Sequence, residues 1–259
     1  MSKQVAIITG AGGDIGRAIA IQLANDGFAV LCLDILEDLN KETIDLITKN
    51  GGTARALTCD ILNEQDQQSM LAVAQELGTP KALVNNVGAI TGASIQESTI
   101  DNWQRDFDIN LKGAVACFKT LESAFKANQG IVTNIASVNG FGVYGHPGYS
   151  AMKAALVHFT RFASVEYGKF GMRINAVAPG TVRTQAWNDR AKQNPQVFEE
   201  AKRWYPLQRV ADPQDIADAV SFLTSNKANA ITGICLPVDC GLTAGQAELA
   251  GTFSQSSDF

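Results

Sequence analysis

Short apolar runs rich in β-branched residues alternate along the chain with longer segments in which apolar residues recur every three to four positions. The first pattern is typical of buried strands and the second of amphipathic helices. The predicted strands cover residues 5–8, 28–34, 54–59, 82–85, 130–136, 173–178 and 234–238. One helix is predicted between the first glycine loop and Gly27, and the others cover residues 37–50, 64–77, 103–126, 149–167 and 213–224.

This alternation predicts the fold class. Strands that alternate with helices build right-handed crossover units and a parallel sheet that is covered on both faces. We therefore expect a single doubly wound α/β domain over residues 1–259. Two stretches interrupt the rhythm. Residues 181–206, with scattered charge and three large aromatics, are predicted to form a lid over a site, and residues 242–259 to form an arm or a loose end.

Composition narrows the class of protein. Hydrophobic residues make up 46% of the sequence, charged residues 18%, and the net charge is -5. This balance predicts a large buried core, and the lack of a basic face argues against a nucleic-acid partner. No apolar run approaches about 20 residues and no signal-peptide pattern is present, which predicts no membrane segment and a cytoplasmic location. Five cysteines and two histidines show no metal-ligand spacing, so we expect buried reduced thiols and no metal site.

A glycine-rich turn, TGAGGDIG at residues 9–16, lies between the first predicted strand and the first helix. Such a turn presents backbone N–H groups and a helix N-terminus to an anion, as dinucleotide-binding units require. Asp34 closes the second strand, 18 residues after Gly16, where an acid can bind the ribose 2′-hydroxyl. A 2′-phosphate would be repelled there, which favours NAD over NADP. Arg17 is expected to point to solvent, and a helix N-cap is the alternative role for Asp34.

Tyr149 and Lys153 are four residues apart in a predicted helix, so both side chains share one face. Neither a phenol nor an ammonium is poised to exchange protons at neutral pH. An ammonium beside the phenol is expected to lower the pKa of Tyr149 toward the working range. A phenol tuned in this way can take a proton from an alcohol while a hydride leaves. A surface cation–phenol pair is the alternative.

These features together resemble the short-chain dehydrogenase/reductase family, from Val5 to about Gly241. The resemblance implies a Rossmann fold with a seven-stranded sheet in the order 3-2-1-4-5-6-7. It also implies that Ser137 binds the substrate oxygen and that Asn110 anchors a water in a proton relay with the lysine. The interval from Ser137 to Tyr149 is 12 residues, one shorter than expected, which a one-residue loop deletion would explain. The implied catalytic residues are Asn110, Ser137, Tyr149 and Lys153.

The resemblance also carries over the cofactor-binding positions. Asp14 replaces the middle glycine of the family's loop, and we expect its side chain to turn away and cap the first helix. Asp60 corresponds to the acid that contacts the adenine ring. Tyr149 and Lys153 also face the cofactor, and the other predicted positions are Gly10, Gly13, Asp14, Ile15, Gly16, Asp34, Ile35, Asp60, Ile61, Asn86, Val87, Gly88, Pro179, Gly180, Val182 and Thr184.

The substrate is less well defined by the sequence. Loop residues near Tyr149 and aromatics of the predicted lid are candidates for binding it, and the lid arginines could receive an acidic group or face solvent. We expect a dehydrogenase for a secondary alcohol such as a sugar or polyol; a 3-oxoacyl-type carbonyl reductase and a non-catalytic dinucleotide-binding protein are the alternatives. The resemblance implies a homotetramer paired through residues 102–126 and 149–167, and the tail could contact a neighbouring subunit. The candidate substrate residues are Asn139, His146, Trp187 and Trp204, and the lid arginines are Arg183, Arg190 and Arg203.

Overall fold

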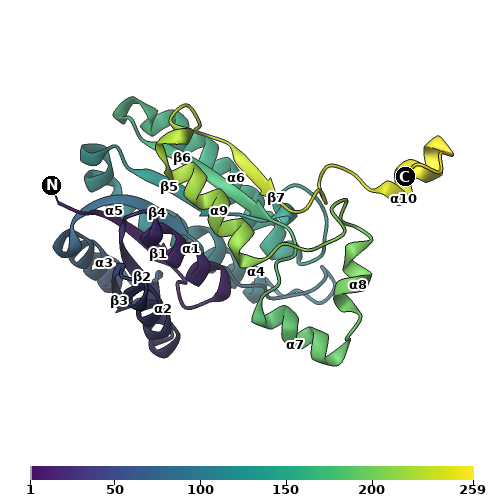
Figure 1. The fold of residues 1–259 in the computed structure, drawn as a ribbon, viewed down its shortest axis with the longest axis horizontal. Helices are drawn as coiled ribbons and strands as arrows, with labels where there is room; N and C mark the ends of the chain where they lie inside the picture. The colour runs from purple at the N-terminus through teal and green to yellow at the C-terminus, as the bar shows by residue number, and fades with distance from the viewer. Residues whose placement is uncertain (1) are drawn as a thin grey trace.

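The computed structural model describes residues 2–259, apart from the side chains at positions 186, 190 and 193, so Arg190 lies outside the described set. Seven parallel strands form one sheet in the order β3-β2-β1-β4-β5-β6-β7, which confirms the predicted topology (Figure 1). Each predicted strand is present with shifts of three residues or fewer at its ends. The strands are β1 Gln4–Thr9, β2 Ala29–Asp34, β3 Thr53–Thr58, β4 Thr79–Asn85, β5 Ile131–Ile135, β6 Arg173–Pro179 and β7 Cys235–Val238.

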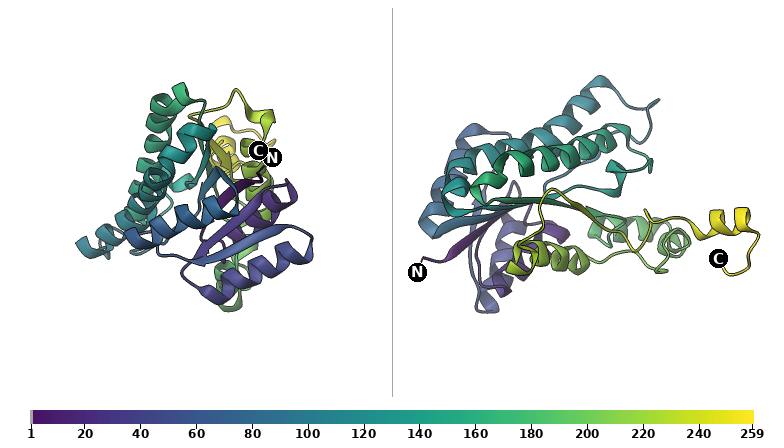
Figure 2. Two further views of the ribbon diagram at one scale, coloured as in Figure 1. Left: turned by 90° about the vertical axis from the view of Figure 1, so that its left-hand side faces the viewer. Right: turned by 90° about the horizontal axis from the view of Figure 1, so that it is seen from above.

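Helices cover both faces of the sheet, and Figure 2 shows them as two layers with the strands between. One buried cluster joins α1, α2 and α9 to the sheet, and a second cluster joins α3, α5 and α6 to the opposite face. Helices therefore shield both faces of the central strands from water, which explains the continuous apolar sequence of these strands. These helices are α1 Asp14–Asn25, α2 Glu37–Lys49, α3 Glu64–Leu77, α5 Gly113–Asn128, α6 Pro147–Tyr167 and α9 Pro213–Thr224.

The helix predicted over residues 103–126 has an irregular middle. It consists of α4 (Ile100–Phe107), a π-helical turn (Asp108–Lys112) and α5. In the turn, the Gly113 N–H reaches back five residues to the Asp108 carbonyl. The Asn110 side chain donates to the Asp106 carbonyl at 3.0 Å, so a side chain occupies an acceptor that a regular helix would reserve for its main chain. π-bulges often mark functional positions, and this one carries Asn110.

The two segments that interrupt the alternation of strands and helices form only short helices. Residues 181–206 hold two short helices, α7 (Gln185–Gln193) and α8 (Val197–Lys202). The C-terminal helix α10 (Ala247–Ser254) has no buried residue, and it extends away from the body as an arm (Figures 1 and 2). Leu249, Phe253 and Phe259 are exposed there. Within residues 2–259, no helix has the length and apolar character needed to cross a membrane.

Candidate active site

Three polar side chains meet at the carboxyl ends of β4 and β5. Lys153 on α6 is 2% exposed, and its Nζ donates to the Ile135 carbonyl at 2.8 Å. The same Nζ lies 5.5 Å from the ring centroid of Tyr149. A Cβ at Gly88 would lie 3.2 Å from Asn110 Oδ1 and 3.3 Å from Lys153 Nζ, so both atoms face the space above this glycine. The predicted grouping of Asn110, Tyr149 and Lys153 is therefore present in the structure.

The amide of Asn110 is fixed by the loop that follows β4. Its Nδ2 donates to the Ala89 carbonyl at 2.8 Å, and its Oδ1 accepts from the Ala89 N–H at 3.2 Å. These two bonds set which way the amide faces, because exchanging its oxygen and nitrogen would break both. Asn110 is 1% exposed, so the orientation is also held by packing.

Ser137 completes the group beside Tyr149. It follows β5 and is buried, and its hydroxyl accepts from the Asn139 N–H at 3.2 Å. Burial raises the pKa of Tyr149, a hydrogen bond with Ser137 lowers it, and the negative charge of Asp106 raises it again. The net direction in the protein alone is upward, so the expectation that the pKa of Tyr149 is lowered toward the working range is wrong for this state. Burial lowers the pKa of Lys153 to about 8 and so weakens the positive charge it can offer.

A buried row of polar side chains ties the catalytic helix α6 to the sheet. Asn85 Nδ2 donates to Asn134 Oδ1 at 2.9 Å, and Asn134 Nδ2 donates to Thr160 Oγ1 at 2.9 Å. Thr160 then donates to the Leu156 carbonyl of its own helix at 2.8 Å. Buried hydrogen-bonded side chains hold neighbouring elements in one register. The row therefore fixes the height of Tyr149 above the strand ends.

The glycine loop has the close backbone contacts that a phosphate cradle needs. Gly10 has φ +66, and a Cβ at Gly16 would lie 2.0 Å from the Gly10 carbonyl oxygen. Thr9 Oγ1 accepts from the Asn86 N–H at 2.9 Å, and Asn86 Nδ2 donates to the Gly10 carbonyl at 3.1 Å. The N-cap of α1 is Gly13, and no side chain caps this helix. Its first-turn N–H groups are thus suited to a dinucleotide pyrophosphate.

Asp34 faces the glycine loop and does not cap α2. Its Oδ2 accepts from the Gly12 N–H at 2.9 Å and its Oδ1 accepts from the Leu36 N–H at 3.0 Å. Leu36 is itself the N-cap of α2, so the alternative role for Asp34 is wrong. A carboxylate held at this position at the end of β2 fits a ribose diol and disfavours a 2′-phosphate.

The expectation that Arg17 points to solvent is wrong. Its Nη2 donates to Glu42 Oε2 at 2.9 Å and to the Gly12 carbonyl at 3.2 Å, while its Nε donates to Thr43 Oγ1 at 3.2 Å. The guanidinium is thus folded back over α2, with its charge paired to Glu42. A cation engaged in this way is not free to receive a 2′-phosphate.

Asp14 also differs from its predicted role. We expected it to cap its own helix, but its Oδ2 accepts from the Gln185 N–H at 2.7 Å, at the first residue of α7. Carboxylates are stabilised at helix N-termini by the unpaired N–H groups and the helix dipole. Asp14 therefore turns away from the glycine loop, as expected, but toward α7 in the predicted lid segment, and it joins the two.

The other predicted cofactor positions line the same edge of the sheet. Asp60 Oδ1 accepts from the Leu62 N–H at 2.9 Å, which shapes the turn after β3 around the buried Ile61. After β6, a Cβ at Gly180 would lie 3.1 Å from the Asp239 Cα, so this turn packs tightly on the end of β7. Val182 is buried and forms an isolated bridge with Ala211. The remaining positions also lie at the carboxyl ends of strands: Ile35 follows β2, Val87 follows β4, Pro179 ends β6 and Thr184 precedes α7.

The four candidate substrate residues divide into two pairs. Asn139 and His146 stabilise the loop before α6, because Asn139 Nδ2 donates to the Gly145 carbonyl at 3.0 Å and His146 Nδ1 lies 3.2 Å from the Gly92 carbonyl. Trp187 lies with its ring 6.3 Å from that of Phe198 in the lid. Trp204 packs against the core and is covered by Arg203, whose guanidinium lies 4.5 Å from its ring centroid. Trp204 thus supports the base of the lid.

Two buried residues near the site were not singled out from the sequence. Asp106 of α4 is 2% exposed and accepts from Thr91 Oγ1 at 2.8 Å. Tyr205, the third large aromatic of residues 181–206 besides Trp187 and Trp204, donates to Thr181 Oγ1 at 2.7 Å and accepts from the Thr181 N–H at 3.0 Å. A lone aspartate in an amphipathic helix normally lies on the solvent side, so no sequence signal marked Asp106 as buried.

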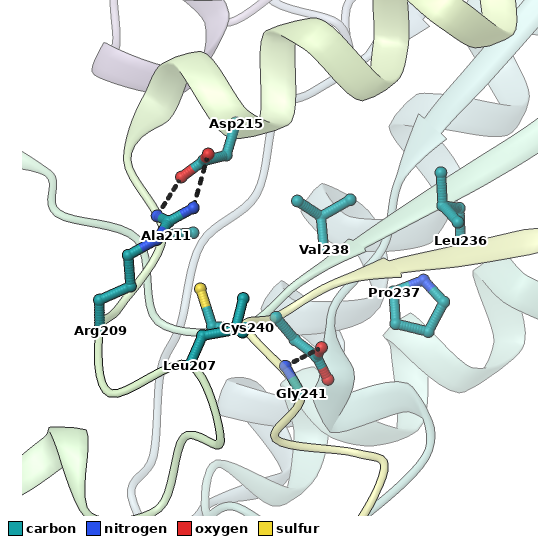
Figure 3. A pocket seen from close by; sticks show the side chains of 10 residues that line it. Leu207, Arg209, Ala211, Asp215, Leu236, Pro237, Val238, Cys240 and Gly241 are labelled. Atoms are coloured by element: carbon teal, nitrogen blue, oxygen red, sulfur yellow. Dashed lines mark hydrogen bonds and ion pairs between the residues drawn. The ribbon is translucent and has the colours of Figure 1, made fainter.

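A separate hollow of about 270 Å³ lies at the end of β7 (Figure 3). The Arg209 guanidinium binds both carboxylate oxygens of Asp215 at one side of it, at 2.6 and 3.0 Å. Cys240 and Gly241, which also line the hollow, have positive φ values of 53 and 92. None of the four predicted catalytic residues lines it, so the hollow is distinct from the Tyr149 site.

Comparison with known proteins agrees with this geometry. A family model described as enoyl-(acyl carrier protein) reductase matches residues 10–243. The meso-2,3-butanediol dehydrogenase of Serratia marcescens is 33% identical over 250 residues, which cover 95% of this chain and 97% of that protein. A short-chain dehydrogenase/reductase structure from Burkholderia thailandensis matches with a TM-score of 0.92 and 36% identity over 100% of both chains. The actinorhodin polyketide ketoreductase with NADPH matches with a TM-score of 0.87 and 28% identity over 93% of this chain and 97% of that one.

Proposed function

The chain belongs to the short-chain dehydrogenase/reductase family of oxidoreductases, and from this premise we propose that it is an NAD-dependent dehydrogenase of secondary alcohols. One observation carries the proposal. A buried lysine ammonium lies beside the ring of Tyr149, and it shares the space above Gly88 with the Asn110 amide oxygen. Burying an ammonium is costly, and perturbed titratable groups in such a place are typical of catalytic sites.

Each residue has a part in moving the proton. Ser137 holds the substrate hydroxyl beside the Tyr149 phenol, which accepts the hydroxyl proton in oxidation and returns it in reduction. Lys153 supplies positive charge beside the phenol, and Asn110 holds the loop after β4 in place. NAD, when bound, supplies the hydride acceptor. Ser137, Asn110 and Lys153 are all less than 10% exposed, so packing holds each side chain in the position that its role requires.

The choice of NAD rests on Asp34 and Arg17. The Asp34 carboxylate lies at the end of β2 beside Gly12, and the Arg17 charge is neutralised by Glu42. Both features disfavour a 2′-phosphate. Replacing Asp34 with Ala should relax the preference against NADP, measured as the ratio of kcat/KM for the two cofactors. An unchanged ratio would refute the role of Asp34; Asp38→Ala, an acid on the exposed side of α2, is the matched control.

The substrate proposed is a sugar, polyol or other small secondary alcohol. Similarity to a butanediol dehydrogenase supports a hydroxyl-bearing substrate. A 3-oxoacyl-type reductase remains the second candidate, supported by the similarity to a polyketide ketoreductase and by the acyl-carrier substrate that the description of the matching family model names. Reduction of a carrier-bound ketone with rates above those of alcohol oxidation would favour this second candidate.

We also propose a cytoplasmic homotetramer paired through α5 and α6. The face of α6 that turns away from the sheet exposes Phe162 and Val165, which are 63% and 84% exposed in one subunit. Large exposed apolar groups of this kind mark association surfaces. Mass measurement by light scattering tests this assembly, and a monomer at micromolar concentration would contradict it.

The decisive experiment is Tyr149→Phe, assayed for NAD reduction across alcohols, polyols and sugar acids. Loss of the proton-transfer group should lower turnover about 10²–10⁴-fold, while NAD still raises thermal stability by mass action. Tyr167→Phe is the matched control, since this tyrosine lies at the far end of the same helix and packs against Phe118. Normal turnover by the Tyr149 variant would remove the proposed chemistry, and retained NAD binding without any turnover in the natural protein would favour a non-catalytic dinucleotide-binding protein.

A further inference from the structure

The only buried residue of α4 is an aspartate. Asp106 is 2% exposed, whereas every other residue of this helix is half-buried or exposed. A buried carboxylate normally has a cation as a partner, because removing its charge from water is costly. In the part of the chain that the structure describes, no lysine, arginine or histidine lies within ion-pair distance of Asp106. Charge pairing therefore does not explain why Asp106 is buried.

The carboxylate lies against the start of the catalytic helix. Asp106 Oδ2 accepts from Thr91 Oγ1 at 2.8 Å, while its Oδ1 is buried with no hydrogen-bond partner. A Cβ at Gly148 would lie 2.4 Å from Oδ2, so the carboxylate packs directly on the backbone of the residue before Tyr149. This contact requires a glycine at position 148. The acid is therefore fitted to this site in α6.

The main chain of the same residue supports a second catalytic group. The Asp106 carbonyl accepts from Asn110 Nδ2 at 3.0 Å, where the π-helical turn begins. Thr91, the partner of the side chain, lies in the loop whose Ala89 holds the other side of the Asn110 amide. Asp106 thus contacts the Asn110 side chain through its main chain and the backbone next to Tyr149 through its carboxylate.

Charged and titratable groups reach Tyr149 from several elements. On α6 itself Lys153 lies beside the ring, and from α4 Asp106 lies behind the helix start. His146 precedes α6 and turns its Nδ1 to the Gly92 carbonyl, and Ser137 after β5 contributes an uncharged hydroxyl. The two charges have opposite effects on a phenolate. A negative charge beside the start of α6 disfavours it, and the burial of Asp106 reduces the screening of that charge by water.

We propose that Asp106 is a positioning residue for the proton transfer: its carboxylate, held by Thr91 against Gly148, disfavours a phenolate at Tyr149 and so opposes Lys153. The opposition keeps the phenol protonated in the free enzyme and sets the pH at which it becomes a base. This inference rests on the proposed function, in which Tyr149 exchanges the substrate proton.

The test is a spectroscopic titration of the phenol in the cofactor-free protein. The absorbance change on ionisation is recorded against pH for the natural protein and for Tyr149→Phe, and their difference isolates Tyr149 from the other tyrosines. Asp106→Asn keeps the shape and the bond from Thr91 but removes the charge. We expect it to lower the pKa of Tyr149 by about one unit, the size of effect that one like charge gives at short range in a protein interior.

Two variants separate charge from structure. Thr91→Val removes the hydrogen bond but keeps the carboxylate, so the titration should not move downward. Asp101→Asn removes a negative charge from the exposed side of the same helix, and it should leave the titration unchanged. If Asp106→Asn does not fold, Asp106→Ala removes the same charge and leaves space in place of the carboxylate. A titration that stays within about 0.2 units of the natural protein in a folded, uncharged variant overturns the proposal.

The pH dependence of turnover connects this titration to catalysis. In alcohol oxidation, the pH at half-maximal kcat/KM should fall by the same amount in Asp106→Asn as the phenol pKa does. If turnover depends on Tyr149 but neither midpoint moves, this inference alone is wrong. If the phenol pKa falls but the natural protein has no NAD-linked turnover on any alcohol or ketone, the proposed function is wrong, and the catalytic role of Asp106 is overturned with it.

Discussion

The cofactor side and the substrate side of this protein are held together by different kinds of contact. On the cofactor side, contacts to the loop backbone dominate: Gly16 packs so closely on the Gly10 carbonyl that a Cβ would clash, and the side chains of Thr9 and Asn86 bind main-chain atoms. On the substrate side, α8 packs Phe198 and Ala201 against the core, while α7 carries exposed charged groups such as the Asp189–Lys192 pair within the helix, which are 55% and 73% exposed. Exposed ion pairs contribute little to stability. The substrate side therefore depends more on exposed groups than the cofactor side does.

This difference explains how one fold serves many alcohols. A dinucleotide presents the same pyrophosphate and ribose to every such enzyme, so a fixed backbone cradle suits it. Substrates vary, and adaptable loops on a rigid scaffold suit them. Asp14 is the exception, because it lies in the glycine loop but binds the N-terminus of α7. The hydrogen bond from the Gln185 N–H to Asp14 therefore links the cofactor side to the substrate side.

The largest effect on the cofactor side is expected from Gly16→Ala. The added Cβ would lie 2.0 Å from the Gly10 carbonyl oxygen, so the loop or α1 must move. We expect a loss of about 1–3 kcal/mol in the free energy of unfolding without cofactor. Gly13→Ala is the matched control, since its Cβ would approach nothing closer than 3.7 Å. Equal unfolding midpoints in denaturant for the two variants would show that the cradle is not held by this contact.

The buried lysine predicts a pH dependence of nearly the same size. The pKa of Lys153 is about 8 in the folded protein, whereas an unfolded lysine titrates near 10.4. Between these values the unfolded chain binds more protons, so the stability from this group increases as pH rises. The free energy of unfolding of the natural protein minus that of Lys153→Met should grow by about 2 kcal/mol from about pH 8 to about pH 10.

Taking this difference removes the contributions of the buried cysteines. Burial raises the pKa of Cys32 and Cys117 to about 12, which makes the folded protein lose stability as pH rises above the pKa of an unfolded thiol. Both proteins carry these thiols, so their effect cancels. A difference that is flat across this pH range would mean that Lys153 is fully protonated in the folded state.

The two sides also differ in how far the sequence predicts them. The alternation of strands and helices, the glycine cradle and the shared face of Tyr149 and Lys153 follow from local patterns, because strand ends and helix faces have fixed directions, whereas the strand order and the place of Asn110 came from the family resemblance. The direction of a long or charged side chain is decided by its neighbours in the folded protein. Arg17 turned to Glu42 and Asp14 turned to α7 for this reason, and Asp106 was buried by a glycine 42 residues later. Such pairings leave no periodic signal in the sequence.

A smaller effect is expected from Asp14→Ala, which sharpens the boundary between the sides. The variant leaves the Gln185 N–H without its partner, and loss of an acid at a helix N-terminus costs about 0.5–2 kcal/mol. Because this bond caps the first residue of α7, we expect faster amide hydrogen exchange in α7 and a few-fold increase in the KM for substrate. Asp189→Ala removes a carboxylate from the same helix without touching the loop. If both variants change exchange in α7 equally, Asp14 has no special role in the lid.

The smallest change in the stability of the subunit core is expected from removing residues 247–259. The helix α10 buries no residue on its own chain, so the free energy of unfolding of an isolated subunit should change by less than about 0.5 kcal/mol. An eight-residue helix is marginal in water without a partner, and Leu249 and Phe253 offer an apolar face for one. If the tail contacts a neighbouring subunit, truncation should lower the mass of the assembly or make its thermal midpoint depend more steeply on protein concentration. Leu249→Ser with Phe253→Ser should reproduce that loss, whereas Glu248→Gln should not; unchanged mass, midpoint and turnover in the truncated protein would mean that the arm has no part in assembly.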